Sequence, residues 1–403
     1  MTHAFRNWCC GMLILLLLVS AAACDVLPDM PDQTTDPVTT EQTTAPGESG
    51  EVPESTEQSG TDTEPPATQA PTTEQTTEEQ GDPEEGIVAP SELGYTYPDL
   101  VEDLAALEDA YGAYFAYESI GKSVDGREIY ACVVGNPDAE NQYLLSGGIH
   151  GKEYLSSLVV MKQMEYYLAS RETGSFNGMQ YADLLDTHAF YVLPMINPDG
   201  IMLALCGIES MQTPEVRATV EKIYADNLRD GLTSSDDINV YLAYNWKANA
   251  NGVDLNRNFA LSNWADVRTG ILAPCYRNYK GPRAASEPET QAVSAYVESL
   301  GEIKALLAYH TAGQVVYWDC GMTGGVRQQT LDLAKAVCEH TGYKLIYDKH
   351  LDASLNDWVT LEKGVPSVTI ELANVIYPMP TSELEDAFAQ TKELWIVAAQ
   401  QFG

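Results

Sequence analysis

Short apolar runs typical of β-strands alternate with longer segments of helical periodicity from about Gly94 to Gly403. Such alternation predicts an α/β domain with a mixed, mostly parallel sheet and helices on both of its faces. The expected strands are 128–134, 143–149, 189–196, 305–309 and 367–372. The expected helices include 97–111, 156–169, 286–299 and 328–341.

Four polar residues lie at or near the ends of these apolar runs, namely His150, Asn197, His310 and Glu371. In open α/β sheets, ligands bind in the crevice at the carboxyl ends of the strands. The pattern therefore predicts a single functional site at one edge of the sheet.

His150 and Glu153 are three residues apart in the segment Gly-Gly-Ile-His-Gly-Lys-Glu, directly after an expected strand. This spacing can place an imidazole and a carboxylate on one side of a strand end, and both groups are good Zn²⁺ ligands. A catalytic zinc site needs three protein ligands and one open position, and His310 offers a third ligand. By itself a His-x-x-Glu motif is a weak signal, because motifs this short often occur without a metal.

Residues 1–23 have the character of an export signal. An apolar run at 12–19, too short to span a bilayer, is followed by three alanines and then Cys24. A cysteine after small residues resembles a bacterial lipoprotein processing site, so we expect a lipid anchor at Cys24 and a place on the bacterial cell surface. The alternative is ordinary cleavage and secretion, and either route takes the protein out of the cytoplasm.

Residues 24–93 are dominated by Thr, Glu, Gln, Pro and Ser, and positions 25–90 contain no Lys or Arg. A segment with so few apolar residues cannot offset the entropy lost on ordering, so we expect a disordered tether. Its prolines and like charges favour an extended chain. The folded domain is expected at 94–403.

The whole chain carries a formal net charge of −37 and has a pI of about 4.2. No basic stripe exists in the sequence, which argues against nucleic-acid binding. An acidic surface also repels anionic lipid headgroups, so we expect membrane attachment only through the lipid anchor.

Eight cysteines are present, and three of them belong to the expected signal region. The other five are Cys132, Cys206, Cys275, Cys320 and Cys338. An odd number allows two disulfides at most, and the absence of a Cys-x-x-Cys pair argues against a structural zinc site.

Several segments, taken together, resemble the M14 zinc carboxypeptidase family in their order and spacing. They are 118–127, His150 to Glu153, 193–200, 246–259, 286–289, His310 and Glu371. The resemblance runs from about Tyr95 to the C-terminus. It implies an eight-stranded mixed sheet flanked by helices and one bound Zn²⁺.

By this resemblance, His150, Glu153 and His310 are the zinc ligands. Asp254 corresponds to a carboxylate that orients His150, an arrangement that fixes the imidazole tautomer. Glu371 corresponds to the general base, which takes a proton from the attacking water and gives it to the leaving amine. From its own segment alone, Glu371 reads equally well as a salt-bridged acid at a strand end.

Asn256 and Arg257 correspond to residues that hold the terminal carboxylate of a substrate, and the planar Arg fork suits bidentate binding. Lys247 replaces an Arg that stabilises the developing oxyanion in many members, where losing one such donor costs about 2.7–4 kcal/mol. Lys152 similarly replaces an Arg that assists substrate binding.

Asn356 stands where the family sets its side-chain preference, and it is neither apolar nor acidic. It therefore predicts a substrate side chain that can form hydrogen bonds, since unpaired polar groups in such a pocket are penalised. The family's mobile Tyr has no clean counterpart, and Tyr347 and His350 are the two alternatives.

These assignments predict an exported, monomeric zinc metallocarboxypeptidase that hydrolyses a peptide bond next to a free C-terminal carboxylate. The segments around Trp246 and Tyr309 are most similar to a bacterial branch that acts on peptidoglycan stem peptides, at γ-D-glutamyl–diamino acid bonds. Three alternatives stay open: a general secreted carboxypeptidase acting on L-peptides, an endopeptidase, and a non-catalytic module of this fold that binds cell wall or peptide.

Overall fold

A computed structural model describes residues 86–348 and 350–403. The expected export signal and all but the last eight residues of the expected tether lie outside this range. Among the helices described, none is both long enough and apolar enough to cross a membrane.

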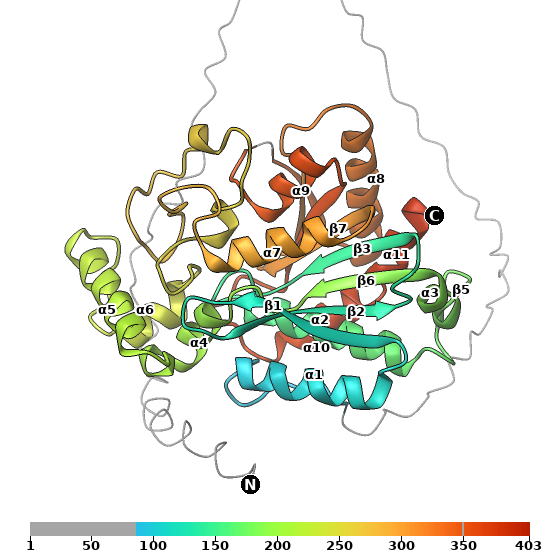
Figure 1. Cartoon of the computed structure of the whole chain (residues 1–403), viewed down its shortest axis with the longest axis horizontal. Helices are drawn as coiled ribbons and strands as arrows, with labels where there is room; N and C mark the ends of the chain where they lie inside the picture. Colours follow the sequence, from blue (N-terminus) through green and yellow to red (C-terminus); the bar gives the residue numbers. More distant parts are fainter. Residues whose placement is uncertain (1–85, 349) are drawn as a thin grey trace, which may run out of the picture. The chain divides into compact units, whose positions relative to one another are not determined.

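A mixed eight-stranded sheet forms the centre of the domain, in the order β1-β2-β6-β3-β7-β10-β8-β9 (Figure 1). Four neighbouring pairs are parallel, β6–β3, β3–β7, β7–β10 and β8–β9, and the other three are antiparallel. The strands are β1 (Phe115–Lys122), β2 (Glu128–Gly135), β3 (Asn141–Ser146), β6 (His188–Leu193), β7 (Ile303–Thr311), β8 (Val315–Trp318), β9 (Lys344–Tyr347) and β10 (Ser367–Leu372), and a separate hairpin contains β4 (Ser175–Phe176) and β5 (Met179–Gln180). The predicted fold class is confirmed.

Helices cover both faces of this sheet (Figure 1). They are α1 (Tyr97–Tyr111), α2 (Tyr154–Ala169), α3 (Tyr181–Thr187), α4 (Pro198–Cys206), α5 (Pro214–Arg229), α6 (Ile238–Asn245), α7 (Pro288–Ser299), α8 (Gly324–Thr341), α9 (Leu355–Lys363), α10 (Glu383–Thr391) and α11 (Leu394–Phe402). Short 3₁₀ turns occur at Ile208–Ser210, Leu255–Arg257 and Trp264–Asp266. The expected helices at 97–111, 156–169, 286–299 and 328–341 are present as α1, α2, α7 and α8.

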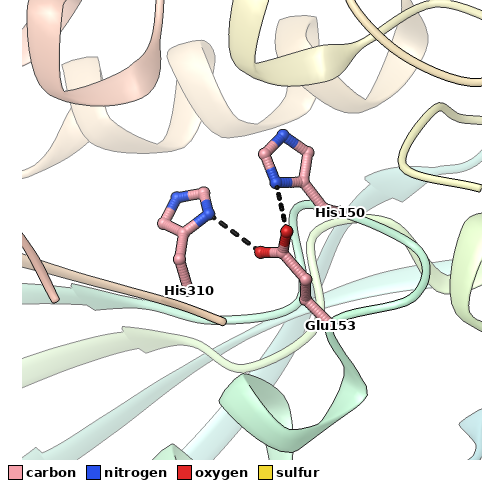
Figure 2. A group of neighbouring side chains, drawn as sticks. All are labelled: His150, Glu153 and His310. Atoms are coloured by element: carbon pink, nitrogen blue, oxygen red, sulfur yellow. Dashed lines mark hydrogen bonds and ion pairs between the residues drawn. The ribbon is translucent and has the colours of Figure 1, made fainter. Parts of the chain in front are cut away.

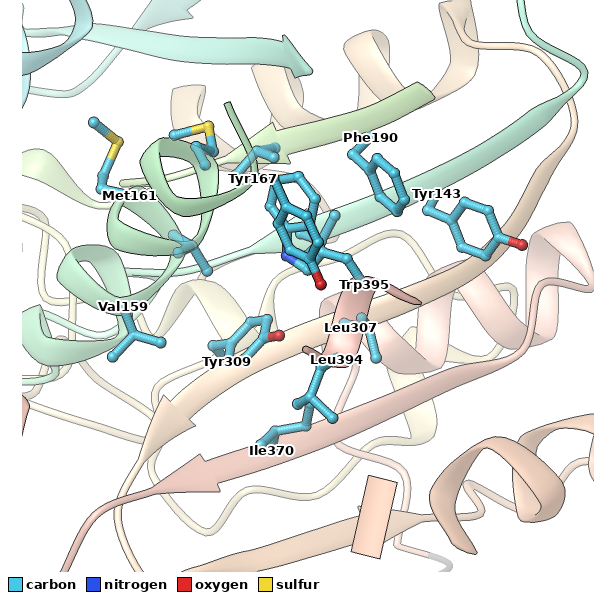
Figure 3. Close-up of a cluster of buried hydrophobic side chains, with 14 of the residues drawn as sticks. Tyr143, Val159, Met161, Tyr167, Phe190, Leu307, Tyr309, Ile370, Leu394 and Trp395 are labelled. Atoms are coloured by element: carbon cyan, nitrogen blue, oxygen red, sulfur yellow. The ribbon is translucent and has the colours of Figure 1, made fainter. Parts of the chain in front are cut away.

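Alternate side chains of the central strands enter two different cores. On one face Leu307 of β7 and Ile370 of β10 pack with α2 and with Trp395 of α11, as Figure 3 shows. On the other face Leu306 and Ala308 of β7 pack against α7 and α9. Because side chains alternate along a strand, this pattern assigns the positions from Ala305 onward in β7, and those of β10, to one face or the other.

The register of β7 and β10 brings two of the predicted site residues together. Glu371 of β10 lies directly opposite His310 of β7 in this parallel pair. His310 follows the even-numbered residues Leu306 and Ala308, so it lies on the face covered by α7 and α9. In β10 the residues Val368, Ile370 and Leu372 enter the opposite core, so Glu371 lies on the same face as His310. The two side chains therefore leave the sheet on the same side.

The N-terminal end of α9 is fixed by a capping box. The Ser354 side chain accepts a hydrogen bond from the Asp357 N–H at 3.0 Å, and Asp357 accepts one from the Ser354 N–H at 3.1 Å. Such reciprocal caps satisfy two amides that the helix itself leaves unpaired. The capping box therefore fixes the backbone at the start of α9, where Asn356 lies.

Residues 86–93 belong to the packed part of the chain. Val88 is buried, and the amides of Ile87 and Val88 donate to the carboxylate of Glu165 on α2 at 2.5 and 3.2 Å. Composition groups these residues with the tether, whereas the structure seats them on α2. A shortened protein that begins at Gly94 would leave Glu165 without these donors.

Among the described residues no two cysteines form a disulfide with each other, and Cys132, Cys275 and Cys320 are buried. The sequence allows two disulfides among the five, and the described part of the chain contains none.

Candidate metal centre

Three side chains meet at the carboxyl end of the central strands (Figure 2). His150 lies in the loop after β3, Glu153 immediately precedes α2, and His310 is near the end of β7. Nδ1 of His150 is 3.1 Å from Oε1 of Glu153, and Nδ1 of His310 is 3.0 Å from Oε2. The carboxylate thus lies between the two imidazoles.

This group fits the ligand set of a zinc ion. One ligand atom from each of the three residues lies within 4.8 Å of the others, and all three side chains are buried. Zinc in proteins takes imidazole nitrogen and carboxylate oxygen at about 2.0–2.2 Å, which small rotations of these side chains would allow. No other group of three His, Cys, Asp or Glu side chains among the described residues has ligand atoms this close together.

A close backbone approach shapes the turn that carries two of these ligands. A Cβ atom built on Gly151 would lie 2.4 Å from the carbonyl oxygen of Gly200, far inside van der Waals contact. Glycine at 151 therefore lets the His150–Glu153 turn lie against the start of α4. Asn197, which caps α4, adds hydrogen bonds to the carbonyls of Ile149 and Ala248.

Asp254 holds the far side of the His150 ring. Its Oδ1 is 3.1 Å from Nε2 of His150, and its Oδ2 accepts a hydrogen bond from the Asn278 N–H at 2.9 Å. Burial alone would raise the pKa of Asp254, but the adjoining imidazole of His150 and the charge of Arg257 hold it below its usual range. An ionised Asp254 accepts the Nε2 proton, which leaves the Nδ1 lone pair free for a metal.

Replacing Asp254 by asparagine is expected to weaken zinc binding about 10- to 100-fold, the usual cost of losing a partner of this kind. The amide cannot accept as strongly from Nε2, so the imidazole becomes less basic and less well oriented. Competition with a chromophoric chelator measures the affinity. The exposed Asp266→Asn variant is the matched control and should bind zinc like the unchanged protein. Equal affinities for the two variants would remove Asp254 from this role.

Glu371 lies beside the three ligands without a partner of its own. No hydrogen bond or ion pair holds its carboxylate within the described chain. Burial, followed by the nearby charge of Glu153, raises the pKa of Glu371 to about 8. A partly buried carboxyl with this affinity for a proton has the property required of a general base.

Lys247 brings a positive charge to the same place. Its Nζ is 2.8 Å from Oε1 of Glu153. Burial disfavours the charge, but the carboxylates of Glu153 and Glu371 outweigh burial and raise the pKa of Lys247. Lys247 therefore remains an ammonium group and can stabilise negative charge that develops beside the three ligands.

A cavity of about 290 Å³ opens next to this group. Seven of the predicted site residues line it: His150, Lys247, Asn256, Arg257, His310, Asn356 and Glu371. Glu153 and Asp254 lie directly behind the histidines, to which they are hydrogen-bonded. Lys152 is not part of the lining; its Nζ lies 3.2 Å from the carbonyl oxygen of Tyr244.

Arg257 and Asn256 present donors to the cavity. The guanidinium of Arg257 lies 3.2 Å from Oδ2 of Asp352, which is partly exposed, and also donates to the Asn256 carbonyl. Oδ1 of Asn256 accepts from the Leu355 N–H at 3.1 Å, so its amide nitrogen remains to donate. A ligand carboxylate could replace Asp352 on Arg257 and meet the amide of Asn256 as well.

Asn356 is a buried amide without a partner. It is only 9% exposed, and neither Oδ1 nor Nδ2 forms a hydrogen bond. An unpaired buried polar group costs roughly 1–3 kcal/mol, and at the cavity wall both polar atoms are available to pair with a ligand. The role of Asn356 in specificity remains a prediction.

The cavity wall also contains residues that the sequence motifs did not indicate. They are Tyr317, Trp318, Asp319, Cys320, Met322, Asp348, Asp352, Ser354, Asp357, Ser367 and Thr369. Tyr317 pairs with Thr369 in the β8–β10 register, so strand alternation after His310 could have suggested it. Of the two candidates for a mobile Tyr, His350 lines the cavity, whereas Tyr347 lies against Trp318 outside it.

Comparison with known proteins places this geometry in context. The zinc carboxypeptidase family model matches residues 100–394. The chain is 26% identical over 303 residues to gamma-D-glutamyl-L-diamino acid endopeptidase 1 of Lysinibacillus sphaericus, covering 75% of this chain and 71% of that protein. It is 29% identical over 218 residues to mouse mast cell carboxypeptidase A, covering 54% of this chain and 44% of that protein.

Solved structures show the same fold. Thrombin-activatable fibrinolysis inhibitor superposes with a TM-score of 0.60 at 18% identity, covering 77% of this chain and 75% of that one. Carboxypeptidase A from Helicoverpa armigera superposes with a TM-score of 0.55 at 17% identity, covering 76% and 73%. At these identities the likeness shows that the fold is shared.

Proposed function

This chain belongs to the zinc carboxypeptidase family, and on that premise we propose that it cleaves γ-D-glutamyl–diamino acid bonds in peptidoglycan stem peptides. The family consists of zinc-dependent peptide hydrolases, and the His-Glu-His group fits zinc. One observation carries the finer proposal: a single cavity joins the metal group to Arg257, to the unpaired Asn356 and to a wall of carboxylates.

The chain's own residues can perform each step of such a hydrolysis. Zinc, when held by His150, Glu153 and His310, lowers the pKa of a water molecule to about 7 and polarises the scissile carbonyl. Glu371 takes the proton from the attacking water and gives it to the leaving nitrogen. Lys247 donates to the oxygen that becomes negative as the tetrahedral centre forms.

Arg257 and Asn256 would orient the residue that leaves. The bidentate guanidinium fork binds the free carboxylate next to the scissile bond, and the Asn256 amide adds a donor. This carboxylate displaces Asp352 from Arg257, so Asp352 then needs another cation. An ammonium group on the departing residue would supply one.

The cavity charges favour a departing residue of this kind. Five carboxyl groups line the cavity, from Asp319, Asp348, Asp352, Asp357 and Glu371, against the positively charged Lys247 and Arg257. Asp319 is already paired with Arg327, and Asp357 accepts from two backbone amides, so Asp348 and Asp352 are the carboxylates that could receive an ammonium group. A diamino acid has an ammonium group for the acidic wall and polar atoms for Asn356. A purely apolar side chain would leave both unpaired, which carries a large penalty.

We also propose that the protein is located outside the cytoplasm, next to the cell wall that contains this substrate. A lipid anchor at Cys24 and an extended tether that ends before residue 86 would hold a monomeric catalytic domain next to the cell wall. Simple secretion would bring the enzyme to the same polymer. Labelling with a radioactive fatty acid, compared between the full chain and its Cys24→Ser variant, separates the two routes.

Product analysis by mass spectrometry tests the substrate. The full chain is incubated with L-Ala-γ-D-Glu-diaminopimelate and with ordinary L-peptides, each with and without a chelator. We expect chelator-sensitive release of diaminopimelate. Cleavage of the L-peptides alone would make the protein a general carboxypeptidase, and cleavage of neither by the zinc-loaded protein would favour a binding module.

Replacing Asn356 by leucine should reverse the side-chain preference. We expect kcat/KM for the diaminopimelate tripeptide to fall about 10- to 100-fold, since a hydrogen bond to a charged group of the substrate is worth about 1.5–3 kcal/mol. Peptides ending in an apolar residue should be cleaved faster than by the unchanged enzyme. The ratio of the two rates within one preparation controls for active enzyme, and an unchanged ratio would exclude Asn356 as the selecting residue.

A further inference from the structure

Three cationic residues lie on neighbouring backbone segments beside the metal group. The Lys152 N–H donates to the carbonyl of Trp246 at 2.8 Å, and the Lys247 N–H donates to the carbonyl of Tyr276 at 2.8 Å. Arg277 directly follows Tyr276. These hydrogen bonds hold the segments of Lys152, Lys247 and Arg277 next to one another.

Two of these cations have no carboxylate partner. Lys152 contacts the carbonyl oxygen of Tyr244 at 3.2 Å and lies 3.7 Å from the ring centroid of Tyr377. Arg277 is exposed and lies over the ring of Tyr276, at 5.3 Å from its centroid. Neither takes part in any ion pair of the described chain. In a protein with 59 acidic and 22 basic residues, unpaired cations beside a catalytic centre are unexpected.

The cations also repel one another. The side chain of Lys152 is only partly exposed, so its ammonium group loses hydration as well as facing the charges of Lys247 and Arg277. Such a cluster is stabilised by a bound anion, because an opposite charge at close range offsets both burial and repulsion. The geometry and the charge together indicate a place for an anion.

This place lies outside the cavity that would hold the departing residue. Lys247 lines that cavity, whereas Lys152 and Arg277 do not. Lys152 and Arg277 therefore extend the positively charged region beyond Lys247, outside the cavity that contains Arg257 and Asn356. A substrate whose terminal residue fills the cavity would direct its preceding residue toward this second region.

We propose that Lys152 and Arg277 form a subsite for a carboxylate on the residue that precedes the scissile bond. This inference rests on the proposed function, because a γ-linked glutamyl residue keeps its α-carboxylate free. That carboxylate is separated from the scissile carbonyl by only three carbon atoms. An α-linked peptide has no backbone carboxylate there, so the subsite would distinguish γ-glutamyl bonds from ordinary peptide bonds.

The test compares two tripeptides that differ in this one group. The full chain is given L-Ala-γ-D-Glu-diaminopimelate and its α-carboxamide analogue, L-Ala-γ-D-isoglutaminyl-diaminopimelate. We expect the free acid to be cleaved with a kcat/KM about 10- to 100-fold higher, the range for a charge-assisted contact. In the Arg277→Gln variant this ratio should fall several-fold, and in the double variant Lys152→Met/Arg277→Gln it should approach one.

Two further measurements keep the result specific. Arg283→Gln removes an exposed arginine whose guanidinium contacts only backbone carbonyls, and it should preserve the ratio. Calorimetric binding of both tripeptides to the Glu371→Gln variant should show the same preference as a difference in Kd, without turnover.

The outcomes separate this inference from the proposed function. Cleavage of both tripeptides at equal rates by the unchanged protein would overturn the subsite and leave the function standing. A ratio that survives in the double variant would also overturn it. Cleavage of neither tripeptide would overturn the proposed function and the subsite with it.

Discussion

Replacing Glu371 by glutamine is expected to lower kcat about 10²- to 10⁴-fold, the usual contribution of a positioned general base. The amide has the same shape but cannot accept a proton from the attacking water. Because the Glu371 carboxylate forms no hydrogen bond or ion pair in the described chain and only the backbone of this residue pairs with neighbouring strands, the substitution should not disturb the sheet. Steady-state kinetics on the diaminopimelate tripeptide measure the change.

Two controls make the result for Glu371 specific. Zinc content should remain one ion per chain, since Glu371 is not among the three ligand side chains. The exposed Glu385→Gln variant carries the same chemical change away from the cavity and should keep full activity. A Glu371→Gln variant with more than about one tenth of the original kcat would mean that another group takes the proton.

Replacing Arg257 by methionine is expected to lower kcat/KM by about 30- to 5,000-fold for substrates with a free terminal carboxylate. Truncating one partner of a buried, hydrogen-bonded charge pair costs about 2–5 kcal/mol, and each 1.36 kcal/mol is tenfold in rate. Methionine keeps most of the side-chain volume and removes the guanidinium fork. The side chain of Arg257 is 19% exposed, so most of it is withdrawn from water.

The same tripeptide with a C-terminal carboxamide controls for general damage. The unchanged enzyme should prefer the free acid strongly, and the Arg257→Met variant should cleave acid and carboxamide at similar, low rates. Arg257→Lys should recover only part of the preference, because an ammonium group cannot bind a carboxylate in the bidentate manner. An Arg257→Met variant that still prefers the free acid would show that the carboxylate binds elsewhere, and cleavage within longer chains would then become the better account.

The ligand group could be predicted from the sequence because its residues follow apolar runs that are easily recognised as strands. The strand expected at 305–309 is buried on both faces, and His310 comes directly after it. Glu371 lies inside the strand expected at 367–372, which the structure reproduces as β10. The relation between His310 and Glu371 needs the pairing of β7 with β10, which no local pattern specifies.

The rest of the site depends on contacts between distant segments. The acidic cavity wall contains Asp319, after β8, and Asp348, after β9, and both of these strands have only four residues. Strands this short give little periodicity, so neither was expected. The missing partners of Asn356 and the neighbouring cations Lys152 and Arg277 follow from packing, which sequence motifs do not describe.

Anomalous diffraction from crystals of the zinc-loaded protein locates the metal ion itself. We expect one strong anomalous peak at the zinc edge, about 2.0–2.2 Å from Nδ1 of His150, Nδ1 of His310 and a carboxylate oxygen of Glu153. Nε2 of His150 should still face Asp254, and Glu371 should lie beside the metal without binding it. A peak elsewhere, or zinc bound by other side chains while this group stays empty, would contradict the assignment of the catalytic centre.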